Sequence, residues 1–219
     1  MSNSDTADQI ANPFDPGYFE TDELLKMGFG HIGQNVRVAK NATIIGLRNI
    51  SIGDNVRIDG QTVIAAHTGT LQVGNFVHIG GGCHIGCAGG IILSDFCGLS
   101  QGVGIYTCSD DYSGNSLTNP TVPREFLNVT CKSVRLGRHV IIGSGSVLLP
   151  GADVGDGSSV GALSLVSKAL GEWGVYFGIP VKKLRTRSRK LLEDETRLLE
   201  ESSKRASNEI ANLVNSTEL

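Results

Sequence analysis

The hexapeptide Ile52-Gly53-Asp54-Asn55-Val56-Arg57 decides the fold, because related hexapeptides recur along most of the chain. Each copy opens with an aliphatic residue, followed by glycine in five of the six copies. The other copies begin at Ile32, Val73, Leu93, Leu136 and Val154. Successive copies start 20, 21, 20, 43 and 18 residues apart, so a unit holds about three steps of six. The step of 43 contains one unit plus an insertion.

A period of six predicts a left-handed parallel β-helix, an all-β fold with three flat faces. One aliphatic side chain of each hexad points inward, and the polar residues turn the chain at a corner. Gly, Asn and Asp suit these corners because they tolerate left-handed backbone angles. The alternatives are a right-handed solenoid or a β-sandwich, but a sandwich alternates with period two and turns every 8–12 residues. We expect the β-helix to span residues 31–184.

Composition limits the classes of protein that remain. The 219 residues are 40% hydrophobic and 19% charged, which is enough apolar material for a sizeable core. The net charge of −3 comes without a dominant basic stretch, which argues against nucleic-acid binding. No signal peptide opens the chain and no apolar run approaches the ~18 residues of a membrane span. We therefore expect a cytoplasmic protein.

Three segments flank or interrupt the repeat. Residues 1–30 form an N-terminal segment in which Thr21 can cap a short helix that ends at Met27 and closes the first coil. Residues 110–130 break the period with Gly and Pro, which predicts a projecting loop. Residues 185–219 are charged with apolar residues at helical spacing, which predicts a C-terminal amphipathic helix.

Five cysteines lack C-x-x-C pairing: Cys83, Cys87, Cys97, Cys108 and Cys131. Four of them lie within strongly patterned segments, where free cysteine behaves as a small hydrophobe. We expect buried thiols, with a metal ligand or a nucleophile as the alternatives.

The repeat resembles the hexapeptide-repeat acyltransferase superfamily from about Gly30 to Pro180. Three longer strings look like bacterial sugar acetyltransferases, a group often labelled galactoside O-acetyltransferase-like. They are Ser109-Asp110-Asp111-Tyr112-Ser113-Gly114, Leu117-Thr118-Asn119-Pro120-Thr121-Val122-Pro123 and Trp173-Gly174-Val175-Tyr176-Phe177-Gly178-Ile179-Pro180. The resemblance implies an enzyme that uses acetyl-CoA, a small sugar-like acceptor, and a homotrimer with active sites between subunits.

In such relatives coenzyme A lies extended between neighbouring prisms near their last coils. The matching residues here offer small side chains to the pantetheine amides, cations to the phosphates and a wall to the adenine. They are Gly143, Ser144, Gly161, Ala162, Ser164, Ser167, Lys168, Pro180, Lys182, Lys183 and Arg185.

Histidine is the natural general base near neutral pH. We expect His31 and His139 to be solvated turn residues. His67 and His84 are the candidates for the base, and a mechanism without a histidine base is the third possibility. His67, followed by the string that ends in His78, is similar to amino-sugar N-acetyltransferases, where the second His lies near the thioester, although two extra residues separate them here.

Acceptor contacts are expected from Asp110, Asp111, Tyr112 and Asn115. Galactoside and maltose acetyltransferases have a His where this chain has Asp110, so their usual base is missing. Carboxylates can hold acceptor hydroxyls or an ammonium group. The alternative is that these residues only form a turn.

Two enzyme functions follow from the resemblance. The first is N-acetylation of a nucleotide-linked amino-deoxy sugar for surface polysaccharide or O-antigen, by direct attack in a ternary complex. The second is O-acetylation of a sugar hydroxyl, which needs a base more strictly. Remote alternatives are a non-catalytic β-helix scaffold and a γ-carbonic-anhydrase-like metal enzyme. We expect no metal, because zinc would need three converging histidines and no such trio is evident.

Overall fold

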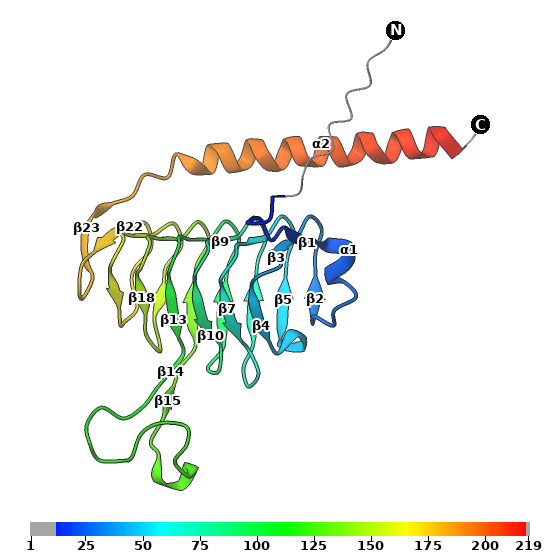
Figure 1. Cartoon of the computed structure of the whole chain (residues 1–219). Coiled ribbons are helices and arrows are strands. Elements are labelled where there is room, and N and C mark those ends of the chain that lie inside the picture. Colours follow the sequence, from blue (N-terminus) through cyan, green and yellow to red (C-terminus); the bar gives the residue numbers. More distant parts are fainter. Residues whose placement is uncertain (1–11, 218–219) are drawn as a thin grey trace.

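The computed structural model describes residues 12–217, and it forms a column of stacked coils (Figure 1). One helix, α2 (Leu191–Thr217), runs along the column, and a loop leaves it near β14 (Cys108–Ser109) and β15 (Thr130–Cys131). The column is the left-handed parallel β-helix expected from the period of six.

The six hexad starts stack on one face, here called face B. Its strands are β2 (His31–Ile32), β5 (Ile50–Ile52), β8 (Leu71–Val73), β11 (Ile91–Leu93), β16 (Val134–Leu136) and β19 (Asp153–Val154). All are parallel, and each start pairs in register with the next, from Ile32 opposite Ile52 to Leu136 opposite Val154. The repeat in the sequence therefore sets the strand register.

From face B the chain turns onto face A and then onto face C. The strands of face A are β1 (Tyr18–Glu20), β3 (Arg37–Ala39), β6 (Arg57–Ile58), β9 (His78–Ile79), β12 (Gly98–Leu99), β17 (Ile141–Ile142), β20 (Ser159–Val160), β22 (Gly174–Phe177) and β23 (Lys182–Thr186). The strands of face C are β4 (Thr43–Ile45), β7 (Val63–Ala65), β10 (His84–Gly86), β13 (Gly104–Tyr106), β18 (Val147–Leu148) and β21 (Leu165–Val166). We name the corners in chain order BA, AC and CB.

The interior of the column is a set of aliphatic ladders. Ile58, Ile79, Leu99 and Ile142 occupy neighbouring strands of face A in register, and each is almost completely buried. Similar aliphatic side chains contact one another from each coil to the next, so each coil is stabilised mainly by its two neighbours.

Corner BA differs from the expectation that small polar residues occupy the left-handed positions. Asn35 and Asn55 fit it, with φ of 54° and 58°, but Phe76, Phe96 and His139 adopt φ of 56°, 60° and 57°. Their rings stack in a column, with centroids 4.8 Å apart in both successive pairs. Because left-handed angles are unfavourable for bulky residues, this stacking offsets part of the cost.

The N-terminal helix is shorter than expected and is not capped by Thr21. Helix α1 (Thr21–Leu24) follows Glu20, whose backbone N–H donates to the Glu23 carboxylate at 3.1 Å. The Thr21 hydroxyl instead accepts a hydrogen bond of 2.8 Å from the backbone N–H of Val36, which ties the helix to the prism. The buried Leu24 closes the first coil, as expected.

The C-terminal helix begins later than residue 185. Residues 182–186 form β23, an antiparallel edge strand beside β22, and α2 begins at Leu191. The charged run was read as helix because a short edge strand with exposed side chains has no apolar period to reveal it. Between residues 12 and 217, no helix has the length and apolarity needed to cross a membrane.

The cysteine expectation holds for three residues and is wrong for two. Cys83, Cys87 and Cys97 are buried and free, but Cys108 and Cys131 form a disulfide. The pair lies 23 residues apart, at opposite ends of the insertion, so only the loop geometry brings the two thiols together. The disulfide joins β14 to β15 at the base of the projecting loop, where the strands pair over two residues.

Replacing Cys131 by Ser should release the projecting loop without melting the prism. We expect amide hydrogens of residues 110–130 to exchange faster, while the thermal midpoint moves little, because this two-stranded ladder is separate from the core. Hydrogen exchange read by mass spectrometry measures both regions. Thr130→Ser is the matched control, and unchanged exchange in the Cys131→Ser loop would show that the disulfide does not hold it.

Candidate active site

The five histidines lie on different surfaces of the prism. His31 lies on face B, His78 on face A and His84 on face C, while His67 follows β7 at corner CB and His139 lies at corner BA. His78 and His84 therefore lie on different faces. Six residues separate them, and the chain turns from one face to the next within that step.

His84 points outward from the middle of face C. It pairs in register with Val63 on one side and Gly104 on the other, and its side chain is exposed. Its ring stacks against Tyr106, with centroids 5.6 Å apart. Within the described residues no hydrogen bond or ion pair engages the imidazole. Both ring nitrogens are therefore free to exchange protons with a ligand.

His67 lies at the N-terminal end of the column. It lines a hollow of about 660 Å³ beside Gly46, Arg48 and Asn49. The small-residue turns expected to bind coenzyme A belong to the last coils, several strands away in the same stack. His67 is therefore separated along the column from the expected donor site.

His78 is held in a cluster on face A. Its Nε2 lies 2.7 Å from Asp59 Oδ2, and the Tyr18 hydroxyl donates to the other oxygen of Asp59 at 2.9 Å. Burial alone would raise the pKa of the Asp59 carboxyl, but hydrogen bonds from His78 and Tyr18 lower it, with help from the charge of Arg57. Asp59 thus stays ionised and fixes the His78 ring.

His139 is not the solvated turn residue that we expected. Its side chain is only 10% exposed, and its Nε2 lies 2.8 Å from Glu195 Oε2 on α2. Glu195 also pairs with Arg138. Sequence spacing cannot reveal this contact, because the partners are 56 residues apart. His139 anchors the C-terminal helix to corner BA.

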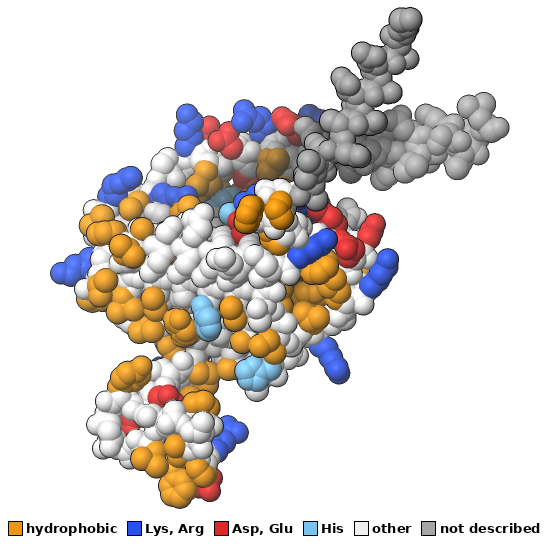
Figure 2. All heavy atoms as spheres, viewed as in Figure 1, with side chains coloured by type: hydrophobic (Ala, Val, Ile, Leu, Met, Phe, Trp, Pro, Cys, Tyr) orange, Lys and Arg blue, Asp and Glu red, His pale blue; other side chains and the backbone are white. Residues whose placement is uncertain are grey.

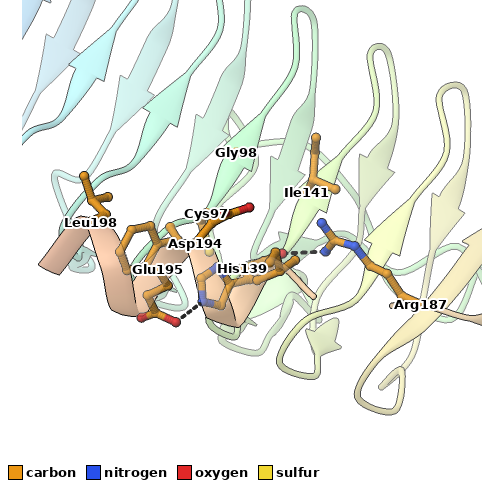
Figure 3. A pocket seen from close by; sticks show the side chains of 10 residues that line it. Cys97, Gly98, His139, Ile141, Arg187, Asp194, Glu195 and Leu198 are labelled. Atoms are coloured by element: carbon orange, nitrogen blue, oxygen red, sulfur yellow. Dashed lines mark hydrogen bonds and ion pairs between the residues drawn. The ribbon is translucent and has the colours of Figure 1, made fainter. Parts of the chain in front are cut away.

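A cavity of about 350 Å³ lies between α2 and the prism at this contact (Figure 3). Arg187 spans one side, donating to the backbone carbonyls of His139, Gly157 and Ser158 at 2.7, 3.0 and 3.3 Å. Burial lowers the pKa of its guanidinium. His139 is paired with Glu195, and Arg187 is engaged by backbone carbonyls, so the cavity belongs to helix docking rather than to catalysis.

Replacing Glu195 by Gln should loosen the start of α2. The change takes the carboxylate from the partly buried His139 and leaves Arg138 paired with Asp95 alone. We expect the partly buried ion pair to contribute about 1–3 kcal/mol, between the values for exposed and buried pairs. We expect trypsin to cut after Arg197 several-fold faster, with the prism intact. Glu200→Gln, on an exposed part of the same helix, is the control, and equal cleavage rates in the two variants would contradict this role.

Corner AC carries the small residues expected to bind the donor. Gly143 and Ser144 follow β17, and Gly161 and Ala162 follow β20 one coil further along. Their glycines have no room for a side chain, since a Cβ at Gly143 would lie 2.4 Å from the Ala162 nitrogen. The backbone N–H groups of Ser144 and Ala162 make no hydrogen bond within the described residues.

Four of the equivalent N–H groups at corner BA are occupied by side chains. Asp54, Asn75, Asp95 and Asp156 accept from the backbone N–H of Gln34, Asp54, Asn75 and Arg138 in the neighbouring coil, at 2.7–3.0 Å. Corner AC has Ser144 and Ala162 at this position instead. Sequence reasoning missed this difference, although Ser144 and Ala162 stand where corner BA has Asp or Asn in most coils. Corner AC is therefore a line of open donors.

The other expected donor-site residues are more scattered. Ser164 is buried, and its hydroxyl accepts from the backbone N–H of Gly178 at 3.0 Å, so it braces the last coil. Ser167 and Lys168 follow β21 at corner CB. Pro180 lies in the turn from β22 to β23, and Lys182, Lys183 and Arg185 lie exposed on β23.

The expected acceptor residues all lie on the projecting loop. Asp110 is exposed, and Tyr112 is 94% exposed. The side-chain and backbone hydrogen bonds of Ser113 lower the pKa of Asp111, which also accepts from the Ser116 hydroxyl at 2.9 Å. The backbone N–H of Asn115 donates to the Ser113 hydroxyl. Asp111 thus performs the turn role that was the alternative, and Asp110 and Tyr112 remain available.

Within one chain these groups do not converge. The open donors line corner AC, His84 lies on face C, and the loop leaves corner CB and projects away from the column (Figure 1). In residues 12–217, no three His, Cys, Asp or Glu side chains gather as metal ligands would. The described surface thus offers three separate features. They are the unbonded backbone N–H groups of corner AC, the His84 imidazole without a hydrogen-bond partner, and the Asp110 carboxylate on the projecting loop.

Stacked parallel coils of this kind are the fold of the hexapeptide-repeat acyltransferases. No family model matches the chain, but individual proteins do. The chain is 40% identical over 179 residues to dTDP-4-amino-4,6-dideoxy-D-glucose acyltransferase of Escherichia coli, covering 82% of this chain and 93% of that protein. The chain therefore belongs to the family of that acyltransferase.

A solved structure and a second relative agree with this family. AntD, an N-acyltransferase from Bacillus cereus in complex with dTDP and 3-hydroxybutyryl-CoA, is 37% identical with a TM-score of 0.80, covering 85% of this chain and 98% of AntD. AntD has also been solved with dTDP-4-amino-4,6-dideoxyglucose and coenzyme A, and with replacements at one serine and at one aspartate ten residues further on. WbbJ of Escherichia coli, a putative lipopolysaccharide biosynthesis O-acetyl transferase, is 29% identical over 70% of this chain and 74% of WbbJ.

Proposed function

We propose that this protein transfers an acyl group, expected to be acetyl, from acyl-coenzyme A to the amino group of a dTDP-linked amino-deoxy sugar. The observation that carries the proposal is the 40% identity, over 93% of its length, to an enzyme named for such a sugar. The AntD complexes, which hold a dTDP-amino sugar together with coenzyme A, support the same pairing of substrates.

The donor lies along corner AC in this proposal. Pantetheine carries amide carbonyls that need hydrogen-bond donors, and the unpaired N–H groups of Ser144 and Ala162 are one coil apart on a surface without bulky side chains. One of these N–H groups can also stabilise the oxyanion of the tetrahedral intermediate. Lys182 and Lys183 on β23, two strands beyond β20 on face A, suit the phosphates.

His84 is the preferred general base over His67. It pairs with Gly104, which pairs in turn with Val147, so only one strand separates its strand from the β18 strand that follows the Gly143 turn. His84 takes the proton that the amine loses as it attacks the thioester carbonyl, and the coenzyme A thiolate leaves. His67 follows β7, one strand further than β10 from that turn.

Direct attack is favoured over a covalent acyl-enzyme. Burial raises the pKa of the Cys83 thiol, and it raises the pKa of Cys87 to about 12. Both thiols are therefore protonated near neutral pH, whereas the thiolate is the nucleophile in thioester exchange. A ternary complex of the two substrates with the protein follows.

The spacing of the two AntD replacements supports a role for the projecting loop. Ser100 and Asp110 have the same separation, as do Ser146 and Asp156. Ser146 is buried and donates to the Gly161 carbonyl, so Ser100 and Asp110 are the better match. Ser100 follows β12 at corner AC, and Asp110 begins the loop, where its carboxylate suits an acceptor ammonium.

A homotrimer with active sites between subunits would bring the donor site at corner AC, His84 and the projecting loop together. The loop of one subunit can reach corner AC of the next, although the two are apart within one chain. The outward strand positions of face C carry no charged side chain, and they include the 48% exposed Ile45 and the 39% exposed Tyr106. Figure 2 shows hydrophobic and histidine side chains, with few charged ones, on the prism above the loop. Such a face suits contact with another copy.

Turnover assays test the function directly. The protein is incubated with acetyl-CoA or 3-hydroxybutyryl-CoA against dTDP- and UDP-linked amino sugars and plain glycosides, and products are read by mass. We expect an amide product from a dTDP-amino sugar, which resists hydroxylamine. Acylation of plain glycosides alone would contradict the proposal.

O-acylation is the second candidate, supported by the WbbJ match and by the strings from Asp110 to Pro123. A hydroxylamine-labile ester in the same assay would establish it. Both candidates place the product in surface polysaccharide, such as O-antigen, for which the WbbJ name is the support.

A further inference from the structure

We propose that Tyr106 is a positioning residue that holds the imidazole of His84 for proton transfer. The inference rests on His84 being the base of the proposed function. The two rings are stacked on face C, with centroids 5.6 Å apart and planes inclined by 27°.

A glycine creates the space for this contact. Gly104 lies directly opposite His84 in the register of β10 and β13, and Tyr106 follows two residues later on the same side of β13. A Cβ at Gly104 would lie 2.9 Å from Cε2 of Tyr106 and 3.3 Å from its hydroxyl oxygen. The Tyr106 ring therefore lies over the bare backbone of Gly104, beside the imidazole.

Stacking is the means of orientation that the described surroundings of His84 provide. His78 and His139 are each held by a carboxylate, from Asp59 and Glu195. Such a carboxylate occupies one ring nitrogen. The Tyr106 ring restricts the His84 rotamer while leaving both nitrogens open. This arrangement suits a general base, because the ring is oriented while both nitrogens remain available to accept a proton.

Three variants distinguish the contribution of the Tyr106 ring from those of its hydroxyl group and of Gly104. Tyr106→Phe keeps the stacked ring and should retain at least half of kcat. Tyr106→Leu removes the ring and should lower kcat about tenfold, with KM for acyl-CoA within twofold and a changed acidic limb of the pH profile. Gly104→Ala displaces the ring and should resemble Tyr106→Leu. Phe14→Leu, at a 92% exposed aromatic residue, is the control.

The contact itself is measured without turnover. In protein labelled with ¹⁵N-histidine, the His84 signals are assigned by their loss in His84→Ala, and Tyr106→Leu should shift them while Tyr106→Phe leaves them near their original positions. Circular dichroism and sedimentation confirm that each variant keeps its fold and assembly.

The outcomes distinguish two failures. Wild-type kcat and unmoved His84 signals in Tyr106→Leu overturn the positioning role, as does a Tyr106→Phe loss equal to that of Tyr106→Leu. If His84→Ala keeps full activity while Tyr106→Leu still shifts the His84 signals, the base assignment fails and the inference fails with it, although the ring contact is real. If Tyr106→Leu slows kcat equally in the His84→Ala background, Tyr106 acts independently of His84 and the inference is wrong.

Discussion

Replacing His84 by alanine is expected to lower kcat by roughly 10² or more, because general-base catalysis contributes about 10²–10⁴-fold. Coenzyme A binding should change little, since the open donors of corner AC lie on another surface of the prism. Steady-state kinetics with acetyl-CoA and a dTDP-linked amino sugar measure both quantities. The limb of the pH profile that reports the base should disappear.

His67→Ala is the matched comparison for this experiment. His67 is an unengaged histidine that follows β7, one strand further from the Gly143 turn than His84, so we expect kcat within about threefold of the unmodified protein. A large loss in His67→Ala with full activity in His84→Ala would reverse the two assignments. Full activity in both would remove histidine from the mechanism.

Replacing Ile79 by alanine should produce the largest loss of stability. Ile79 is 0% exposed and lies between Ile58 and Leu99 in the ladder of face A. Truncating a buried isoleucine removes hydrophobic burial and leaves a cavity, at a cost of about 2–5 kcal/mol. Stacked coils cannot close around the gap, because the strand spacing is set by the neighbouring hydrogen bonds. Denaturant unfolding followed by circular dichroism measures the change.

Ile92→Ala controls for the substitution itself. Ile92 lies on the outer side of face B and is 41% exposed, so its truncation should cost less than about 1 kcal/mol. Similar losses in both variants would mean that the inward ladder is not the main source of stability.

The fold was predictable because its signal is repeated. Ile32, Ile52 and Val73 were recognised as coil starts from spacing alone, and they lie in register on one face. The features that were not predicted occur at only one or a few positions and are not part of the repeat. Phe76 and Phe96 occupy left-handed corners because each ring stacks on the next, and a prediction from the backbone preference of one residue cannot include that help.

The candidate site was less predictable for a related reason. Gly143 and Gly161 were found as small residues, but the open N–H groups beside them depend on what the next coil lacks. Tyr106 was missed because its proposed role depends on the bare backbone of Gly104 and on His84, the register partner of Gly104 twenty residues earlier in the chain. His139 was misjudged because its partner lies on a helix distant in sequence.

The antiparallel strands β1 and β23 at the two ends of face A have a consequence for how the protein behaves in concentrated solution. A stack of parallel coils is a natural template for end-to-end growth, since each exposed edge offers hydrogen-bonding groups to another copy. At both ends of this face the last strand runs in the opposite direction, so an incoming column finds no edge that continues its own pattern. Polymerisation into fibres along this face is thereby discouraged, and lateral association remains open.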